Sequence, residues 1–417
     1  MGNKRLKIYI YNPSVKTGGT SNLLANLTIL LASNNKFDIY YLDYLNSPLI
    51  KIIREKKSAV RINFLDANKI ITIDNNALLI TILLKVKSLE MHLKINKNAR
   101  LLFWSTHPDD GLKILPSFNF WLRFPIKYSK IVSKIIHPYF KGRLMNFFSD
   151  GVNNNGIVFM DQSNIDTNLS FYDFVGEPSI IPIFTMNSEI DCIGPIKHRK
   201  GSLKIVVLGR LTNFKVNTLY GLIEQINDHS NSSNDTFSID FIGDGPLRSK
   251  LENFISDMEF IKCNFLGHID LNELDNVLIE YDLLIGMATS TLEGAKLKLP
   301  SIIIDASYEV IPKEFIKLKW LFEVAPYSVG SFISKKDNSF KGRPFPDIIQ
   351  EIKDCNSMKI IGEDCYSHWN KYHSSESVSK MIASKIEKNK FYYYNIKKHT
   401  RKDFISEIID NVKEIIK

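Results

Sequence analysis

Short apolar runs rich in β-branched and aromatic residues alternate along this chain with longer stretches of helical periodicity. The first run, KIYIYN, spans Lys7 to Asn12. After a Gly-Gly turn, the segment NLLANLTILLAS repeats its apolar positions every three to four residues, as an amphipathic helix does. Four more runs follow: FDIYYLDY, KIITI, RLLFWST and GIVFMD. This alternation predicts strands and helices in βαβα order, which form a parallel sheet covered by helices on both faces.

The alternation lapses between residues 184 and 202, where FTMNSEIDCIGPIKHRKGS is polar and rich in turn-forming residues. Beyond it six further runs appear: KIVVLGR, FSIDFIGDG, KCNFLGH, DLLIGMA, PSIIID and LFEVAP. We therefore expect two doubly wound, Rossmann-like α/β domains at residues 1–190 and 200–385, followed by a helical tail at 386–417. Ligands bind at the carboxyl ends of the strands in such sheets, so the loops that follow the strands carry the candidate chemistry.

The composition is that of a globular protein. Of 417 residues, 44% are hydrophobic and 24% are charged, which excludes wholesale disorder, collagen and coiled coil. Residues 1–196 hold 23 basic and 15 acidic residues, a net +8, whereas the remainder holds 31 and 30. This imbalance indicates that the first half meets an anionic partner. The four cysteines form no C-x-x-C pair, which argues against a disulfide framework or a zinc site and fits a reducing compartment.

Two segments bear on membranes. The amino-terminal residues turn polar too soon for a signal peptide, and the longest apolar run, Ala77 to Val86, has about half of the roughly 20 residues that a membrane span requires. We therefore expect a cytoplasmic protein, peripheral at most. The stretch from Lys113 to Arg143 is basic and interleaved with aromatic residues. It is either a pair of helices with a solvated basic face or a surface for anionic lipid headgroups; nucleic acid has the least support, and we expect no such partner.

The strongest candidate for ligand chemistry is GRLTNFK, where the strand KIVVL ends at Gly209. Arg210 and Lys215 lie five residues apart in the loop before the next helix. Two cations beside the end of a strand suit a diphosphate, because each charge-assisted hydrogen bond contributes about 1.5–3 kcal/mol. Basic loop residues are more often simply solvated, and the spacing alone does not separate these interpretations.

The second candidate follows the strand DLLI. A tight turn at Gly286 leads into a helix with Glu293 in its first turn. Free backbone N–H groups at a helix start bind anions, and the Glu293 carboxylate can accept hydrogen bonds from sugar or ribose hydroxyls. A first-turn acid also favours the helix dipole, so Glu293 has a purely structural interpretation as well. The donor-binding residues expected here are Gly286, Met287, Thr289, Ser290, Thr291 and Glu293.

Two weaker signals lie in the first half. Gly18, Gly19 and Thr20 separate the first strand from the first helix, where backbone comes close to a phosphate or a sugar, although a plain turn explains them equally well. His107 follows the strand RLLFWS, where a polar side chain faces the ligand side of the sheet, although a lone histidine is more often structural.

Another turn, at Gly243, Gly245 and Pro246, also follows a strand. It is not a dinucleotide fingerprint, because Arg248 stands where the third glycine is required. A tight strand-to-helix turn is the favoured interpretation, with a structural role for Asp244.

The segments between about residues 203 and 305 together resemble the retaining glycosyltransferases of family 4, enzymes of the GT-B fold. GRLTNFK resembles the family's G-R-x-x-x-x-K, FIGDGPLRSKLE its G-x-G-P-x-x-x-x-L-E, and LEGAKLKLPSIIID its E-A-x-x-x-G-x-P-x-I. The resemblance implies that Arg210 and Lys215 hold the diphosphate of a sugar donor. It implies further that Glu293 is the second glutamate of the family's E-x(7)-E motif, which binds the nucleotide ribose.

The first half resembles the family in outline. Gly18, Gly19 and Thr20 are similar to its glycine loop, and His107 is similar to its acceptor-side histidine. The resemblance implies that this domain binds the acceptor, often a lipid-linked sugar, and that the carboxy-terminal helix returns to it.

Three positions depart from the family pattern. Ile285 stands in place of the first glutamate, which contacts the donor sugar in the family. Gly294 replaces an alanine, and Lys298 replaces a glycine two residues before Pro300. The variant G-M-x-T-S-x-L-E resembles a bacterial branch that builds surface polysaccharides.

The sequence thus predicts transfer of a hexose-type sugar, with retention, from a UDP- or GDP-linked donor to a cell-surface glycan. Arg210, Lys215 and His107 are the expected catalytic residues, and we expect neither a metal nor a further cofactor. Positive charge and the helix start would stabilise the departing diphosphate. Two alternatives remain: a nucleotide-sugar epimerase of the same fold, and a non-catalytic scaffold, since Ile285 replaces a carboxylate.

Overall fold

The computed structural model describes residues 5–14, 18–56, 61–108, 110–114, 142–190, 202–233, 235–335, 341–352 and 354–400. The chain divides into two compact units. Unit 1 combines Met1–Pro182 with Val378–Lys417, and unit 2 is the continuous segment Ile183–Ser377. The chain therefore passes from one unit to the other twice, and unit 1 is built from both ends of the sequence.

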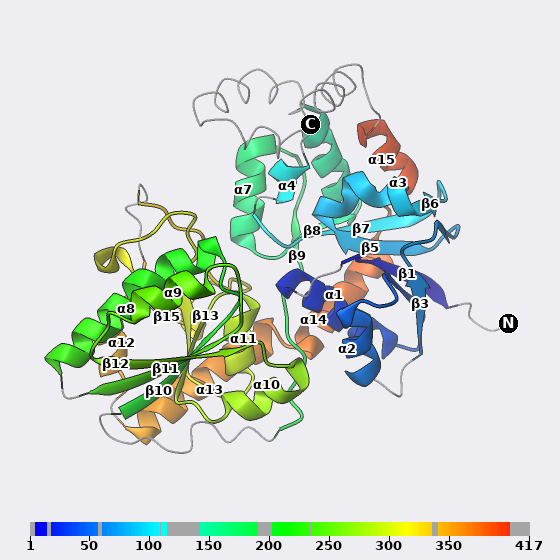
Figure 1. The fold of residues 1–417 in the computed structure, drawn as a ribbon. Coiled ribbons are helices and arrows are strands. Elements are labelled where there is room, and N and C mark those ends of the chain that lie inside the picture. Colours follow the sequence, from blue (N-terminus) through cyan, green and yellow to red (C-terminus); the bar gives the residue numbers. More distant parts are fainter. Residues whose placement is uncertain are drawn as a thin grey trace. The chain divides into compact units, whose positions relative to one another are not determined.

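Unit 1 contains a seven-stranded parallel sheet with the order β3-β2-β1-β5-β7-β8-β9 (Figure 1). The strands are β1 (Leu6–Tyr11), β2 (Phe37–Asp43), β3 (Ile62–Asp66), β5 (Leu78–Ile82), β7 (Arg100–Ser105), β8 (Ile157–Phe159) and β9 (Ser179–Ile180). The helices are α1 (Gly19–Ala32), α2 (Pro48–Lys56), η1 (Leu83–Ser88), α3 (Leu89–His92), α4 (Asp110–Lys113), α7 (Gln162–Tyr172) and α15 (Tyr393–Thr400). Helix α14 (Ser375–Lys388) begins in unit 2 and continues in unit 1.

An aromatic core joins the two ends of the chain within unit 1. The ring of Phe391 lies 6.5 Å from Phe103 and 6.1 Å from Phe147, and all three side chains are buried. The side-chain amide of Asn389 donates to the Leu101 carbonyl at 2.9 Å, and Tyr393 N–H donates to the Ala99 carbonyl at 2.8 Å. The residues after α14 thus complete the core beside β7, while residues 401–417 of the expected tail lie outside the described residues.

Unit 2 contains a six-stranded sheet with the order β12-β11-β10-β13-β14-β15, parallel except for the antiparallel edge strand β15. The strands are β10 (Ser202–Leu208), β11 (Thr236–Ile242), β12 (Ile261–Gly267), β13 (Leu283–Gly286), β14 (Ser301–Ile304) and β15 (Leu318–Trp320). The helices are α8 (Asn213–Ser232), α9 (Arg248–Ile255), α10 (Leu271–Leu278), α11 (Thr289–Ala295), η2 (Lys313–Phe315), η3 (Leu321–Glu323), α12 (Phe345–Gln350) and α13 (Cys355–Tyr372).

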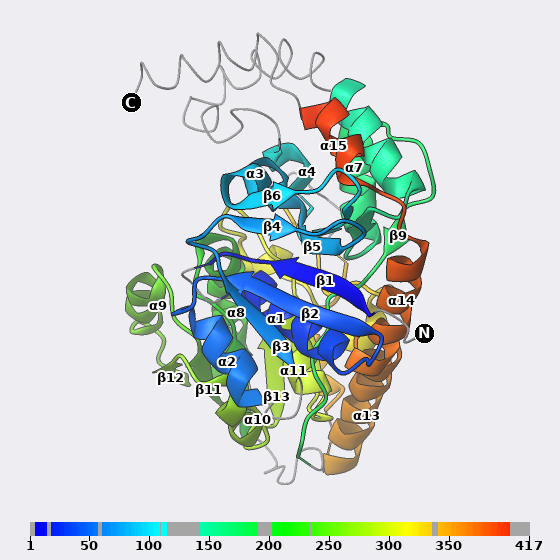
Figure 2. The same cartoon turned by 90° about the vertical axis from the view of Figure 1, so that its right-hand side faces the viewer.

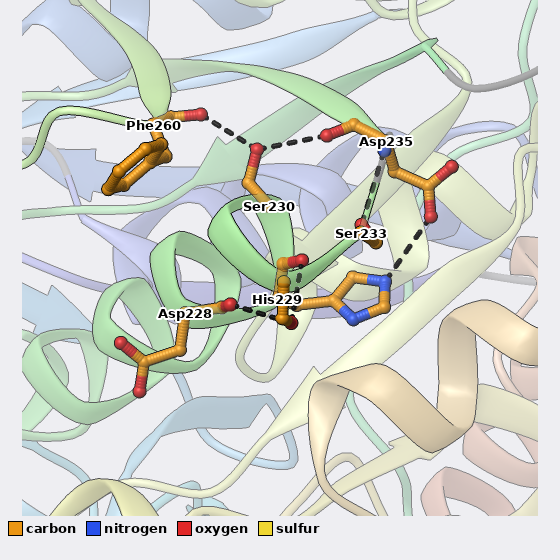
Figure 3. Close-up of polar contacts among 7 residues, drawn as sticks. Asp228, His229, Ser230, Ser233, Asp235 and Phe260 are labelled. Atoms are coloured by element: carbon orange, nitrogen blue, oxygen red, sulfur yellow. Dashed lines mark hydrogen bonds and ion pairs between the residues drawn. The ribbon is translucent and has the colours of Figure 1, made fainter.

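Helices cover both faces of the unit 2 sheet, with α8, α9 and α12 on one face and α10, α11 and α13 on the other (Figure 1). The carboxyl-terminal end of α8 is fixed to the sheet by polar contacts (Figure 3). The Ser230 hydroxyl donates to the carbonyls of Asp235 and Phe260 at 2.9 and 2.8 Å, and His229 Nε2 lies 3.4 Å from the Asp235 carboxylate. These contacts anchor the carboxyl-terminal end of the helix on the segments that lead into β11 and β12.

The predicted α/β class with two doubly wound domains is confirmed, but one predicted strand lies outside the main sheet and another strand prediction was wrong. KIITI supplies only β4 (Ile71–Ile73), which pairs with β6 (Leu93–Ile95) outside the main sheet (Figure 2). The central strand beside β1 is instead β5, from the run that we had weighed as a membrane segment. All five residues of β5 are buried, so it has no alternation of polar and apolar positions by which a strand is usually found.

The strand prediction that was wrong concerns LFEVAP, whose first three residues form the short helix η3 rather than a strand. The Glu323 carboxylate accepts a hydrogen bond from Trp320 N–H at 2.8 Å, which turns the chain directly after β15. A side-chain acceptor placed three residues on favours a helical turn over continued extension. Within the part of the chain that the structure describes, no helix is long and apolar enough to cross a membrane, and residues 115–141 of the basic stretch lie outside that part.

Candidate functional site

A pocket lies in unit 2 where the strand order reverses. Strands β10 and β13 are neighbours, with Leu208 paired to Gly286, and the chain leaves them toward opposite sides of the sheet. Such switch points in parallel sheets are the usual places for ligands. The pocket is lined by Val207, Leu208, Gly209, Arg210, Leu211, Lys215, Leu219, Gly286, Met287 and Ile304. It brings together five of the residues singled out from the sequence: Gly209, Arg210, Lys215, Gly286 and Met287.

Gly209 forms part of the pocket wall, and two polar side chains, those of Lys215 and Ser290, lie close to its Cα. Its φ of +154° lies in a region that favours glycine. A Cβ added there would lie 3.1 Å from Lys215 Nζ and 3.6 Å from Ser290 Oγ. The ammonium of Lys215 and the hydroxyl of Ser290, from α8 and α11, therefore converge above this backbone position, and Arg210 follows directly as an exposed cation.

Lys215 has no counter-ion within the described structure. Its Nζ makes no hydrogen bond or ion pair with any residue that the structure describes. Burial lowers the pKa of Lys215 to about 8, because the wall of the pocket displaces water from the ammonium and no carboxylate offsets that loss. A desolvated cation without a counter-ion raises the free energy of the folded protein. A bound anion would pair with the ammonium and offset that cost.

Binding of inorganic pyrophosphate is expected to weaken as the pH rises above about 8. The free protein loses the Lys215 proton near this pH, whereas a bound anion favours the charged ammonium and raises its pKa. Complex formation therefore takes up a proton near pH 8, and affinity falls by up to about tenfold per pH unit above it. Calorimetry in two buffers of different ionisation enthalpy measures that uptake.

The matched control for this titration is Lys215→Met. The ionisation of pyrophosphate itself is common to both proteins, so the difference between them isolates the lysine. Identical pH dependence in the two proteins would contradict the assignment of Lys215 to the anion.

The glycine turn after β11 packs against the Gly209–Leu211 loop of the pocket. Gly209 N–H donates to the Ile242 carbonyl at 2.9 Å, and Leu211 N–H donates to the Asp244 carbonyl at 3.0 Å. A Cβ on Gly243 would lie 2.2 Å from the Gly209 carbonyl oxygen, so only glycine allows the two loops to touch. Asp244 is exposed and its carboxylate accepts from Gly245 N–H at 2.7 Å, a local turn contact.

The start of α11 is pressed against the end of β13. A Cβ on Gly286 would lie 3.0 Å from the Thr291 nitrogen, so glycine permits this close approach. Ala288 precedes the helix with a φ of +56°, a strained conformation for alanine that the sequence did not indicate. Thr289 and Ser290 are half-buried, whereas Thr291 is fully buried, so its side chain belongs to the interior rather than to the pocket surface.

Glu293 lies in an ion-pair network that the sequence did not reveal. Its carboxylate is 2.5 Å from Lys296 Nζ, which is in turn 2.8 Å from the Asp275 carboxylate of α10. The Glu293 side chain is 16% exposed, so it is neither free in solvent nor sealed in apolar packing. The nearest sequence signal was the three-residue spacing of Glu293 and Lys296 on a helix.

The three departures from the family pattern have distinct structural settings. Ile285 is fully buried within β13 and is not part of the pocket wall. A Cβ on Gly294 would lie 2.6 Å from Ser301 Oγ and 2.9 Å from Leu284 Cδ1, so an alanine does not fit there. Lys298 has a φ of +59°, the left-handed region in which glycine is favoured, and its ammonium pairs with Glu363 at 2.9 Å.

The remaining candidates belong to unit 1. Gly18 precedes α1 with extended backbone, and a Cβ there would meet no atom within 4 Å, so its conformation does not require glycine. Gly19 and Thr20 open that helix. His107 is half-buried after β7, and its backbone N–H donates to the buried Asp110 carboxylate at 3.0 Å. The structure thus places these four residues after the carboxyl ends of unit 1 strands, whereas the pocket residues belong to unit 2.

No protein-family model and no curated protein matches the chain. Solved structures do match it, among them the following three. A glycosyltransferase from Rickettsia africae is 12% identical, with 93% of this chain and 99% of that chain covered and a TM-score of 0.51. HepE from Anabaena, in complex with UDP and glucose, is 12% identical, with 92% and 100% covered and a TM-score of 0.50. The N-terminal domain of trehalose-6-phosphate phosphatase from Candida albicans is 12% identical, with 92% and 97% covered and a TM-score of 0.54.

These similarities define the fold of the chain. It is the GT-B fold, built from two Rossmann-like α/β units. One of the three structures bears the name of a phosphatase, so the activity has to be inferred from the site rather than from the architecture.

Proposed function

We propose that the protein is a glycosyltransferase that uses a nucleotide-diphosphate sugar as donor and binds its diphosphate in the unit 2 pocket. The observation that carries this proposal is the ammonium of Lys215 above Gly209, at the switch point of the sheet, which has no counter-ion among the residues that the structure describes. Arg210 adds a second positive charge at the pocket, and Ser290 adds a hydroxyl. A diphosphate supplies the anion that this arrangement lacks.

The chemistry follows from the charge that develops on the leaving group. An acceptor hydroxyl attacks the anomeric carbon, the bond from that carbon to the phosphate oxygen breaks, and the diphosphate leaves with the electron pair. Lys215 and Arg210 stabilise that charge. The resemblance to family 4 supports retention at the anomeric carbon by attack on the same face, with the departing diphosphate accepting the acceptor's proton. It also supports a role for His107 on the acceptor side.

We extend the proposal to the acceptor, a growing cell-surface glycan that is linked to lipid. The net charge of +8 over residues 1–196 supports an anionic surface as the partner of the first half. The basic stretch from Lys113 to Arg143 is the segment proposed to meet that surface.

A thermal-shift screen with UDP, GDP and their sugar conjugates tests the donor. UDP comes first, because HepE was solved with UDP. A ligand at about 100 times its dissociation constant adds about 2.7 kcal/mol to the free energy of unfolding. For a unit of this size that raises the melting temperature by about 5–10 °C. Lys215→Met is the control and is expected to lose most of the shift.

The outcomes separate the alternatives. No shift with any nucleotide would overturn the proposal. Binding without turnover favours the non-catalytic scaffold, for which the buried Ile285 in place of a carboxylate is the supporting observation. Incubation with donor alone that yields an epimer, rather than transfer to an added acceptor, identifies the epimerase.

A further inference from the structure

Lys296 connects two helices by holding two carboxylates at once. Its Nζ lies 2.5 Å from the Glu293 carboxylate in α11 and 2.8 Å from the Asp275 carboxylate in α10. The three side chains are only 9%, 16% and 15% exposed, for Lys296, Glu293 and Asp275 respectively. At this depth ion pairs are weakly screened by water, so each member strongly affects the charge of the others.

The lysine is the cation that both carboxylates share. Two carboxylates that close to one point repel each other, and the ammonium between them offsets that repulsion. Burial alone would lower the pKa of Lys296, but the carboxylates of Glu293 and Asp275 outweigh that effect and raise it. The contact with Lys296 therefore fixes the direction of the Glu293 carboxylate, whose oxygens accept hydrogen bonds.

The network lies on the same helix face as the pocket. Ser290, Glu293 and Lys296 follow one another at three-residue spacing along α11, so they form one stripe on its surface. Ser290 is the member whose hydroxyl lies above Gly209 beside Lys215. Glu293 thus lies about one helical turn from Ser290, on the helix face that Ser290 presents to Gly209.

We propose that Lys296 is a positioning residue, which holds the Glu293 carboxylate in place and aimed at the ribose hydroxyls of the donor. This inference rests on the proposed function, since it needs a nucleotide diphosphate in the unit 2 pocket. It differs from a purely structural role, in which the three charges only join α10 to α11. In that case the network does not affect how strongly the ribose hydroxyls contribute to nucleotide affinity.

The test compares three ligands on the whole chain by calorimetry: inorganic pyrophosphate, UDP and 2′,3′-dideoxy-UDP. Pyrophosphate contacts the anion pocket alone, and the dideoxy compound lacks the two hydroxyls. The wild-type protein is expected to prefer UDP over the dideoxy compound by about tenfold or more, the effect of hydrogen bonds to a charged group. Lys296→Met is expected to reduce that preference to about twofold or less, while pyrophosphate affinity is unchanged.

The matched control is Lys298→Met, which removes an ion pair of similar length, to Glu363, without touching Glu293. It is expected to keep the wild-type preference. If Lys296→Met does not fold, Lys296→Gln retains an N–H donor and removes the charge, and it is expected to show an intermediate preference.

Two results overturn the inference, and they are distinguishable. If no nucleotide or pyrophosphate binds the wild-type protein, the proposed function fails and the role of Lys296 fails with it. If UDP and pyrophosphate bind but the preference for UDP over dideoxy-UDP is the same in wild type and Lys296→Met, the ion-pair network is structural alone and the proposed function stands.

Discussion

Replacing Lys215 by methionine is expected to slow sugar transfer by about 100- to 1000-fold without unfolding the protein. The ammonium is the desolvated cation nearest to the proposed leaving group, and its loss leaves the developing charge on the diphosphate unpaired. Methionine has a similar length and no charge, so the pocket wall keeps its shape. The turnover number is measured with the donor found in the nucleotide screen, at a donor concentration that saturates each variant.

Lys250→Met serves as the matched control, because Lys250 is exposed on α9 and does not line the pocket. It is expected to retain wild-type turnover. Arg210→Ala is expected to act in the same direction as Lys215→Met, since Arg210 also lines the pocket. Near-normal turnover in both site variants, with normal melting temperatures, would refute the diphosphate role.

Gly243→Ala is expected to destabilise unit 2 by about 2–4 kcal/mol, through a backbone clash and an unfavourable φ together. The added Cβ would lie 2.2 Å from the Gly209 carbonyl oxygen, and φ at Gly243 is +128°. Because Gly209 forms part of the pocket wall, relief of the clash also moves the loop that carries Arg210. Calorimetry is expected to show a melting temperature lowered by about 5–15 °C, together with loss of pyrophosphate binding.

Gly267→Ala is the control for Gly243→Ala, because it introduces an unfavourable φ without a clash of the added Cβ with backbone. Gly267 also has a positive φ, +73°, but a Cβ there would have the Arg248 guanidinium as its nearest neighbour, at 3.7 Å. Its expected cost is about 1 kcal/mol, from the left-handed backbone alone. Equal destabilisation by the two substitutions would mean that the contact between the Gly243 and Gly209 loops does not shape the pocket.

The sequence sufficed for strands β10 to β14 of unit 2, because these strands are short and apolar and turn residues follow them, whereas it missed the edge strand β15. Arg210 and Lys215 were found for the same reason, since they stand directly after such a strand and the fold brings strand ends together. Thr291 stays a predicted donor-binding residue, but its side chain is buried. The sequence could not show this, because one residue along a helix rotates a side chain by about 100° and the sequence does not fix the phase of a helix start.

Other features depend on tertiary contacts that no local pattern announces. Strand β5 is buried on both faces, so its residues show neither alternation nor helical period. The pairing of Lys296 with Asp275 joins residues on different helices, and only their packing reveals it. The strained backbone of Ala288 is likewise set by the approach of α11 to β13 and not by the residue itself.

The discontinuity of unit 1 has a consequence for biosynthesis. Phe391 and Asn389 complete a core whose other members, Phe103 and Leu101, leave the ribosome almost three hundred residues earlier. Unit 2 is one uninterrupted segment and is translated in full before those late residues. Unit 2 can therefore reach its native state during synthesis before unit 1 does. Until residues 389 and 391 are made, part of the apolar core of unit 1 remains exposed.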